Sequence, residues 1–252
     1  MRTKTVAPEM KHDEITPYED GASKKQQVAR MFDNIAVKYD VLNHFFSAGI
    51  DKRWRKKAIR ILAQDQPKRI LDVATGTGDF ALESMVIAPE HIVGVDISKG
   101  MLDVGRMKVA EKGLDDRITF REGDSENLLF SDASFDAVTV GFGVRNFQNL
   151  KAGLSEMYRV LRPGGRLVVL EFSKPRHFPL KQGYFFYFKY VMPFIGRVVS
   201  KDKAAYSYLP QSVLAFPEGK EFEAILAEVG FASLKTRTLT GGIASIYTGL
   251  KP

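Results

Sequence analysis

A glycine-containing loop between a strand-like run and a helix-like run constrains the fold of this chain more than any other feature. The loop reads Gly76-Thr77-Gly78-Asp79-Phe80-Ala81 and directly follows the apolar run 69–73. It has the G-x-G-x-x-A form, in which glycines allow a sharp turn and a close approach of the backbone to a nucleotide. A strand, this loop and a helix in that order predict a parallel sheet with a ligand site at the carboxyl ends of its strands.

Strand-like and helix-like segments alternate along the rest of the chain. The predicted strands are short runs rich in Val, Ile, Leu and Phe, at 69–73, 91–96, 118–122, 135–140, 166–172, 233–239 and 245–250. The predicted helices between them lie at 79–87, 99–112, 151–161 and 219–229. This alternation indicates an α/β domain built on a mostly parallel sheet.

Two longer segments lie outside the alternation. Residues 24–63 are expected to form a helical cap, and residues 173–216 form an insertion after the fifth strand that is too long for a simple connection. Insertions of this length typically carry specificity or act as a lid. We therefore predict a flexible segment at 1–23 and a single domain at 24–252.

The composition excludes several classes of protein. The chain of 252 residues has no cysteine, so disulfides, zinc–thiolate sites and a cysteine nucleophile are ruled out. Its four histidines lack metal-ligand spacing, and we expect no metal site. The net charge of +7 favours anionic partners. Acidic and basic residues are mixed at the N-terminus without an apolar run, which predicts a cytoplasmic protein without a targeting leader.

Acidic side chains around the loop discriminate between two kinds of nucleotide-like ligand. Asp96 follows Gly76 by 20 residues and ends the second predicted strand, where its carboxylate can accept hydrogen bonds from both hydroxyls of a ribose. Asp72 before the loop and Asp79 in the first helical turn disfavour the pyrophosphate of a dinucleotide. The sulfonium and ammonium groups of S-adenosylmethionine are attracted by the same carboxylates, so we favour this co-substrate.

Asp124 and Ser125 follow the third predicted strand and reach the same edge of the sheet. Asp124 can accept a hydrogen bond from an adenine amino group, and the neighbouring backbone supplies a donor. A turn that ends the strand, with an aspartate cap, explains these residues without a ligand. The corresponding alternative for the loop is a tight turn in which Asp96 caps the next helix.

Several ordered segments carry a resemblance to known enzymes. Residues 71–79 (LDVATGTGD), 95–98 (VDIS), 135–138 (FDAV) and 161–165 (LRPGG) resemble the motifs of class I S-adenosylmethionine-dependent methyltransferases. Residues 32–36 with 38–40 (FDNIA, KYD), 142–146 (FGVRN) and 170–175 (LEFSKP) resemble the ubiquinone/menaquinone biosynthesis C-methyltransferase family. The resemblance extends from about Met31 to Pro252.

The resemblance implies a Rossmann-like, doubly wound, seven-stranded sheet and methyl transfer to a ring carbon of a prenylated quinol. The favoured reaction converts demethylmenaquinol to menaquinol, with a ubiquinol precursor as a related substrate. The co-substrate contacts that it implies are Thr77, Asp96, Asp124 and Ser125. To these we add Asp72, Gly76 and Gly78 from the chemistry of the loop. Gly141 departs from the family pattern, since many relatives have Ser or Asn before Phe142.

Methyl transfer to a ring carbon needs an activated acceptor and no metal. The carbon becomes nucleophilic when the adjacent hydroxyl loses its proton, so the reduced quinol is the expected substrate. A phenol with a pKa of about 10 then needs a base or a cation that stabilises the phenolate. Arg145 after the fourth strand is our first candidate, with Asn146 as its orienting partner and Tyr39 closing from the cap; Asp40 and His44 are further candidates. A structural ion pair for Arg145 and core packing for Tyr39 are the alternatives.

The insertion has a composition suited to a lipid surface. Residues 173–203 contain seven Lys or Arg and one acidic residue, Asp202, interleaved with eight aromatic residues. Basic and aromatic side chains together favour a bilayer interface, which predicts peripheral contact with the inner face of the membrane. A small apolar core around a lid is the alternative. The sequence leaves open whether copies of the chain associate.

Three other functions compete with this interpretation. The net charge and the basic run 52–57 (KRWRKK) suit a nucleic-acid methyltransferase. However, residues 143–146 (GVRN) stand where amino-methylating enzymes have an Asn/Asp-Pro-Pro-aromatic turn, and the cytosine-C5 type needs a cysteine, so no nucleic acid is expected as partner. A nicotinamide-dependent oxidoreductase is disfavoured by Asp79. The third alternative is an adenosine-binding module without catalytic activity.

Overall fold

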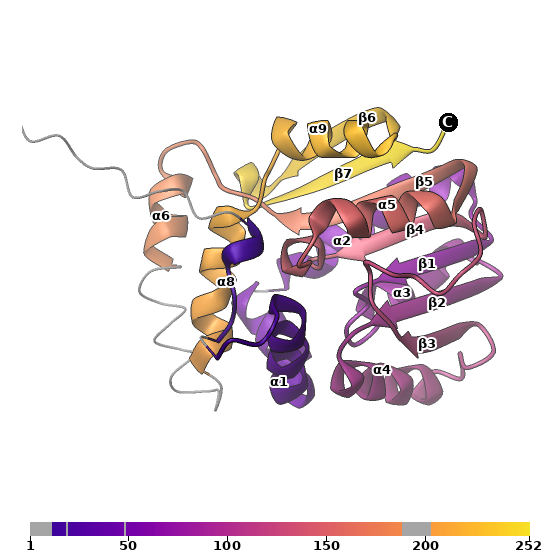
Figure 1. The fold of residues 1–252 in the computed structure, drawn as a ribbon, viewed down its shortest axis with the longest axis horizontal. Coiled ribbons are helices and arrows are strands. Elements are labelled where there is room, and N and C mark those ends of the chain that lie inside the picture. Colours follow the sequence, from indigo (N-terminus) through magenta and orange to yellow (C-terminus); the bar gives the residue numbers. More distant parts are fainter. Residues whose placement is uncertain (1–11, 19, 48, 188–202) are drawn as a thin grey trace, which may run out of the picture.

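A seven-stranded sheet forms the centre of the molecule in a computed structural model that describes residues 12–18, 20–47, 49–187 and 203–252 (Figure 1). The strands are β1 (Arg69–Val73), β2 (His91–Asp96), β3 (Ile118–Glu122), β4 (Phe135–Gly141), β5 (Leu161–Phe172), β6 (Ala232–Leu239) and β7 (Ala244–Leu250). Their order is β3-β2-β1-β4-β5-β7-β6. The first five are parallel, and β7 runs antiparallel between β5 and β6.

Helices cover both faces of the sheet because successive side chains of each buried strand point to opposite sides. Leu71 belongs to the apolar cluster formed with α5 (Leu150–Val160) and α9 (Lys220–Val229). Its neighbour Ile70 belongs to the cluster on the other face, with α2 (Ile50–Leu62), α3 (Asp79–Ser84) and α4 (Lys99–Glu111). Both side chains are fully buried, as a doubly wound sheet requires.

A third group of helices lies beyond the carboxyl ends of the parallel strands (Figure 1). It contains η1 (His12–Glu14), α1 (Lys24–Phe46), α6 (Leu180–Phe186) and α8 (Lys203–Ala215). A separate apolar cluster of Ile15, Val28, Met31, Ala205 and Tyr208 holds the N-terminal segment, α1 and α8 together. The cap and the insertion are therefore packed on each other at the edge where a doubly wound sheet binds its ligands.

The predicted elements agree closely with the observed ones. The seven-stranded, mostly parallel sheet is confirmed, and β1, β2 and β3 have the predicted bounds. β5 begins at Leu161 instead of residue 166, because Leu161 already pairs with Phe135 of β4 across a register shift. The helix predicted at 79–87 divides into α3 and the 3₁₀ helix η3 (Met85–Ile87). Three further 3₁₀ helices are η2 (Ala63–Asp65), η4 (Val144–Asn146) and η6 (Thr240–Gly242).

The proposed boundaries of the domain stay predictions. Of the segment predicted to be flexible, residues 1–11 and 19 lie outside the described part, and Ile15 within it is buried. Residues 188–202 of the insertion, which include Asp202, also lie outside it. None of the described helices combines the length and the apolar character needed to cross a bilayer.

Candidate functional site

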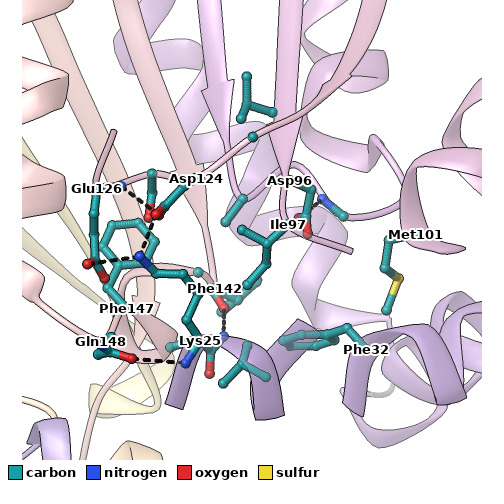
Figure 2. Close-up of a pocket in the computed structure, with 18 of the residues that line it drawn as sticks. Lys25, Phe32, Asp96, Ile97, Met101, Asp124, Glu126, Phe142, Phe147 and Gln148 are labelled. Carbon is teal, nitrogen blue, oxygen red and sulfur yellow. Dashed lines mark hydrogen bonds and ion pairs between the residues drawn. The ribbon is translucent and has the colours of Figure 1, made fainter. Parts of the chain in front are cut away.

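A pocket lies between the carboxyl ends of β1, β2 and β4 and helix α1 (Figure 2). It encloses about 650 Å³ of empty space, its open mouth included, which is within the range of small-molecule sites. β2 and β4 lie on opposite sides of β1, so the pocket is at the point where the strand order reverses. The predicted residues that line it are Tyr39, Gly76, Asp96, Asp124, Ser125 and Asn146.

Asp96 connects the glycine loop to the end of β2. One carboxylate oxygen accepts the backbone N–H of Gly76 at 2.8 Å, and the other accepts that of Ser98 at 2.9 Å. Burial raises the pKa of Asp96 to about 6, although these N–H donors oppose the shift. The carboxylate is thus held at the edge of the pocket in a fixed orientation, with lone pairs left for a ligand.

Two backbone positions in the pocket wall are strained. Ala74 at the end of β1 and Phe142 at the end of β4 have φ angles of +52° and +58°, which non-glycine residues rarely adopt. Both residues line the pocket. Strain of this kind persists where the surrounding structure enforces it, commonly at binding sites.

Gly78 and Asp72 lie behind the pocket wall and not in it. Gly78 has a φ of +78°, and a Cβ there would overlap the ring of Phe120. Asp72 accepts the hydroxyl groups of Thr75 and Thr139, each at 2.6 Å, and burial raises its pKa to about 6. Both residues therefore fix the shape of the loop from below.

Thr77 points away from the lining residues and toward the cap. Its hydroxyl donates to Asp40 of α1 at 2.6 Å and lies 3.2 Å from the Lys108 ammonium of α4. The same ammonium group pairs with Asp40 at 2.8 Å. Thr77 thus ties the glycine loop to α1 and α4.

Asp79 is already paired inside the protein. It forms ion pairs with Lys108 and, at 3.3 Å, with Arg55, which also contacts Asp51 at 2.9 Å and Glu83 at 3.1 Å. These two cations, from α2 and α4, are shared with Asp40, Asp51 and Glu83, and Asp79 does not belong to the pocket lining. The part of our argument for a cationic ligand that rested on Asp79 draws no support from this geometry.

Helix α1 closes the pocket through a pair of charged side chains that sequence reasoning missed. Lys25 forms ion pairs with Asp124 and with Glu126, the latter at 3.2 Å (Figure 2). Eight residues further along α1, Asp33 accepts the hydroxyl of Ser98 at 2.7 Å and the N–H of Gly100 at 2.8 Å. Because Lys25, Asp33 and Asp40 are spaced eight and seven residues apart, they fall near one side of the helix, and this spacing was the available signal.

Arg145 and Asn146 form a short turn, η4, directly after β4. Asn146 lines the pocket, whereas the Arg145 side chain is buried behind it. The Arg145 guanidinium pairs with Glu171 of β5 at 2.9 Å and donates to the carbonyl of Phe142. Burial raises the pKa of Glu171 and the guanidinium opposes this shift. The ion-pair alternative for Arg145 is therefore realised, and its buried Nε–H has no hydrogen-bond partner among the described residues.

The N-terminal segment also contacts η4, which the sequence did not indicate. His12 lies 2.6 Å from the carbonyl oxygen of Arg145, and since a carbonyl only accepts, His12 Nε2 carries the proton. Burial and the nearby Lys24 lower the pKa of His12 to about 4, so the ring is neutral. Lys24 in turn donates to the carbonyl of His12 at 2.6 Å. The side chain of His44, another candidate base, lies outside the described part.

The departure at Gly141 has a local physical reason. A Cβ at this position would lie 2.9 Å from Cδ2 of Phe80, closer than carbon atoms pack. Phe80 belongs to the core on the α3 side of the sheet. Glycine at the end of β4 therefore gives room to this ring, and only backbone groups of Gly141 face the pocket.

Among the described residues, no group of three or more His, Asp or Glu side chains is arranged to hold a metal ion. The polar groups that line the pocket are instead carboxylates, amides and backbone groups beside apolar side chains such as Phe32, Ile97 and Met101. This set fits an adenosine moiety, because a carboxylate suits the hydroxyls of a ribose and apolar side chains suit the base. The sheet order, the loop and this site together define a class I methyltransferase.

Comparisons with known proteins identify the family. A sequence model of the ubiE/COQ5 methyltransferase family matches residues 21–251. A demethylmenaquinone methyltransferase of Bacteroides fragilis is 51% identical over 240 residues, which cover 95% of this chain and 98% of the relative. The ubiquinone/menaquinone biosynthesis C-methyltransferase UbiE of Geobacter sulfurreducens is 49% identical over 230 residues, 90% of either chain. This chain belongs to the ubiE/COQ5 methyltransferase family.

A solved structure supports the fold at greater evolutionary distance. A SAM-dependent methyltransferase from Thermotoga maritima, described as a possible histamine N-methyltransferase, aligns with a TM-score of 0.63 at 19% identity. The alignment covers 89% of this chain and 99% of that one. At this identity the likeness concerns the fold alone, and the acceptor has to be argued from the site.

Proposed function

We propose that this protein transfers a methyl group from S-adenosylmethionine to a ring carbon of demethylmenaquinol and so forms menaquinol. The observation that carries the proposal is the position of Arg145 and Asn146 at the end of β4, beside a pocket with Asp96 at its edge. The names of the relatives from Bacteroides fragilis and Geobacter sulfurreducens support the same acceptor class.

Different residues of the pocket bind different parts of the co-substrate. Asp96 accepts from the ribose hydroxyls, and Asp124 with the backbone of Ser125 binds the adenine edge. Gly76 lies open to the ligand, since a Cβ there would meet nothing within 4 Å. Asp72, Thr77 and Gly78 hold the loop in shape behind it. S-adenosylmethionine would supply the methyl group as an electrophile.

The reaction needs an acceptor that has lost a proton. The quinol hydroxyl next to the reacting position gives up its proton, and its electrons make the ring carbon nucleophilic. The new carbon–carbon bond forms while the electron pair of the sulfur–methyl bond goes to sulfur. The ring carbon then loses its hydrogen as a proton and the phenolate is reprotonated, so the net reaction releases one proton. The enzyme has mainly to align the reactants and exclude water.

Arg145 stabilises the phenolate as a cation and does not take the proton, because a guanidinium stays protonated in proteins. Its Nε is buried and has no hydrogen-bond partner among the described residues. Glu171 fixes the opposite side of the guanidinium and so aims this free donor. Asn146 orients the acceptor from the pocket wall, and Tyr39, packed edge-on against Phe32, closes the site from α1.

Peripheral contact with the inner face of the cytoplasmic membrane accompanies this function, because the acceptor carries an isoprenoid tail. In the described part of the insertion, Phe178 and Phe186 are 80% and 61% exposed. In the chain, Arg176 precedes Phe178, and Lys181 lies between Phe178 and Phe186. Exposed aromatic rings flanked by cations suit the interface of a bilayer with anionic lipids.

A competition between acceptors tests the proposal. The purified protein is given methyl-labelled S-adenosylmethionine with reduced demethylmenaquinol, transfer RNA and duplex DNA in one mixture. Label in the extracted lipid and none in the nucleic acids is the expected result. Label in a nucleic acid would support the rival class of methyltransferase and overturn the proposal.

A further inference from the structure

Three buried polar atoms around η4 have no hydrogen-bond partner among the described residues. They are Nε of Arg145, Oδ1 of Asn146 and the hydroxyl oxygen of Tyr208. Each of the three residues is at most 9% exposed. A buried polar group without a partner costs about 1–3 kcal/mol, so a protein retains one where something else uses it.

Tyr208 reaches this place from the insertion. It lies on α8, which packs against η4. Its ring belongs to the apolar cluster with Val28 and Met31 of α1, and Val28 also lines the pocket. Helix α8 thus brings a phenol from the insertion close to η4 and to the apolar cluster that borders the pocket at Val28, although α8 follows η4 by more than fifty residues in the chain.

The surroundings of Tyr208 keep its hydroxyl protonated, so that it can donate a hydrogen bond. Burial raises its pKa, and Glu171 acts in the same direction, while the Arg145 guanidinium opposes them. These two charges belong to the ion pair behind η4, so they also place the Tyr208 hydroxyl on the side of the site where Arg145 lies. A protonated phenol beside a guanidinium is a second hydrogen-bond donor near the free Nε–H of Arg145.

We propose that the Tyr208 hydroxyl donates a hydrogen bond to an oxygen of the acceptor ring, beside the Nε–H of Arg145. The assignment rests on the proposed function and adds the residue by which the insertion recognises the quinol. Two donors directed at one oxygen strengthen as that oxygen gains negative charge, as in an oxyanion hole. The free Oδ1 of Asn146 adds an acceptor, which a ring hydroxyl can satisfy and a quinone carbonyl cannot.

The substitution Tyr208→Phe isolates the role of the hydroxyl. Because the hydroxyl has no partner in the free protein, its removal should leave the melting temperature unchanged or raise it. The affinity for S-adenosylmethionine should also stay unchanged. We expect kcat/KM for demethylmenaquinol to fall at least tenfold and the pH at which kcat reaches its plateau to rise, since the phenolate is then less stabilised.

Tyr247→Phe is the matched control. Tyr247 is equally buried, but its hydroxyl already accepts the N–H of Gly219 at 2.9 Å. This variant should melt at a lower temperature and keep the kcat/KM of the wild type. The opposite responses of the two tyrosines separate a role in binding the acceptor from a role in stability.

Two outcomes contradict the assignment in distinguishable ways. If the wild-type protein methylates demethylmenaquinol and Tyr208→Phe does so within twofold, or if Tyr208→Phe loses activity only together with its melting temperature, the assignment alone is overturned. If the wild-type protein binds S-adenosylmethionine but methylates no quinol, the proposed function falls and the assignment with it.

Discussion

Burial sets the charge of Asp96, the carboxylate that we propose binds the ribose of the co-substrate. Asp96 has a pKa raised to about 6, so it is ionised at neutral pH and protonated below that value. The two hydrogen bonds from the ribose need the ionised form. We predict that the affinity for S-adenosylmethionine is constant above pH 7 and falls about tenfold per pH unit below about 6. Titration calorimetry between pH 5 and 8 measures this.

The stability of the free protein should respond to pH with the opposite sign. A carboxyl whose pKa is higher in the folded than in the unfolded state destabilises the fold once it ionises, so the contribution of Asp96 decreases as the pH rises from about 4 to 6. The variant Asp96→Asn is the control for the binding measurement, because its affinity for S-adenosylmethionine should be low and independent of pH. An affinity of the wild type that does not change down to pH 5 would contradict the role of Asp96.

Arg145 provides the second prediction at this scale. Arg145→Lys keeps the charge opposite Glu171 and removes the planar Nε donor. We predict that kcat falls about 100-fold while the affinity for S-adenosylmethionine stays within twofold, as for loss of one donor to a developing oxyanion. Steady-state kinetics and calorimetry measure the two quantities.

Arg159→Lys is a suitable control, because Arg159 pairs with Asp132 and Glu156 away from the pocket. It should keep the kcat of the wild type. If Arg145→Lys also keeps it, the buried ion pair with Glu171 is the whole role of Arg145.

Single residues were predictable where they stand next to a predictable strand. Gly76, Asp96 and Asp124 follow strands whose apolar runs are unmistakable, and parallel strands bring their carboxyl ends together. His12, Lys25 and Tyr208 lie in segments that do not follow a predictable strand. Their place at the site depends on how the cap and the insertion pack on each other, which a local pattern does not encode.

Among the elements, α1 is the one that closes the pocket. It contributes Lys25, Val28, Phe32 and Tyr39 to the lining. Its charged side chains contact α4, the glycine loop and the segment after β3. Because these contacts are polar and reach loops and α4, we expect α1 to open more readily than the strands.

Asp33→Ala tests this function of α1. The substitution removes the acceptor for Ser98 and Gly100, at 2.7 and 2.8 Å, without touching the pocket lining. We predict faster hydrogen exchange in α1, unchanged exchange in β1 and β4, and a several-fold faster release of S-adenosylmethionine. Hydrogen exchange with mass spectrometry and stopped-flow release report these effects.

Asp103→Ala removes a comparable acidic side chain from α4, where Asp103 makes an exposed ion pair with Arg106. This control should leave both measurements unchanged, because exposed pairs contribute little. Equal exchange of α1 in the wild type and in Asp33→Ala would show that α1 is held by its apolar contacts.

The sequence predicted elements better than their junctions. The strands were predicted correctly because short Val- and Ile-rich runs bounded by turn residues usually form strands in an α/β chain. The start of β5 was misplaced because Pro163, Gly164 and Gly165 look like a loop. The chain bulges there, with a φ of +78° at Gly164, but the strand already pairs with β4 at Leu161. Pairing across a register shift is a tertiary property and leaves no local signal.

The whole molecule has two differently built sides. The amino-terminal edge of the sheet is closed by short turns, and the carboxyl edge carries α1, α6 and α8 (Figure 1). The pocket, η4 and the exposed rings of Phe178 and Phe186 all belong to the second side. In the proposed function the substrate has a polar ring and a long apolar tail, and the protein approaches the bilayer with this side.

The double substitution Phe178→Ser and Phe186→Ser tests the approach to the membrane. We predict that the wild type sediments with vesicles that contain anionic lipids at low salt, that binding weakens as salt is added, and that the double variant binds at least several-fold less. Activity toward a water-soluble quinol with a truncated tail should be unchanged.

Val86→Ser is the control for lost apolar surface, since Val86 is 79% exposed in η3, which precedes the amino-terminal end of β2. It should bind vesicles like the wild type. No sedimentation of the wild type at low salt would contradict the membrane contact and leave the chemistry of the site untouched.

The reaction itself is tested most directly by its dependence on the redox state of the acceptor. The protein is incubated with methyl-labelled S-adenosylmethionine and demethylmenaquinone, with and without dithionite, and the extracted lipid is analysed by mass spectrometry. The account predicts one labelled methyl group on the ring with dithionite and none without it. No label under either condition, with binding of S-adenosylmethionine confirmed, would contradict the proposed function, and equal label under both would contradict the phenolate that Arg145 is assigned to stabilise.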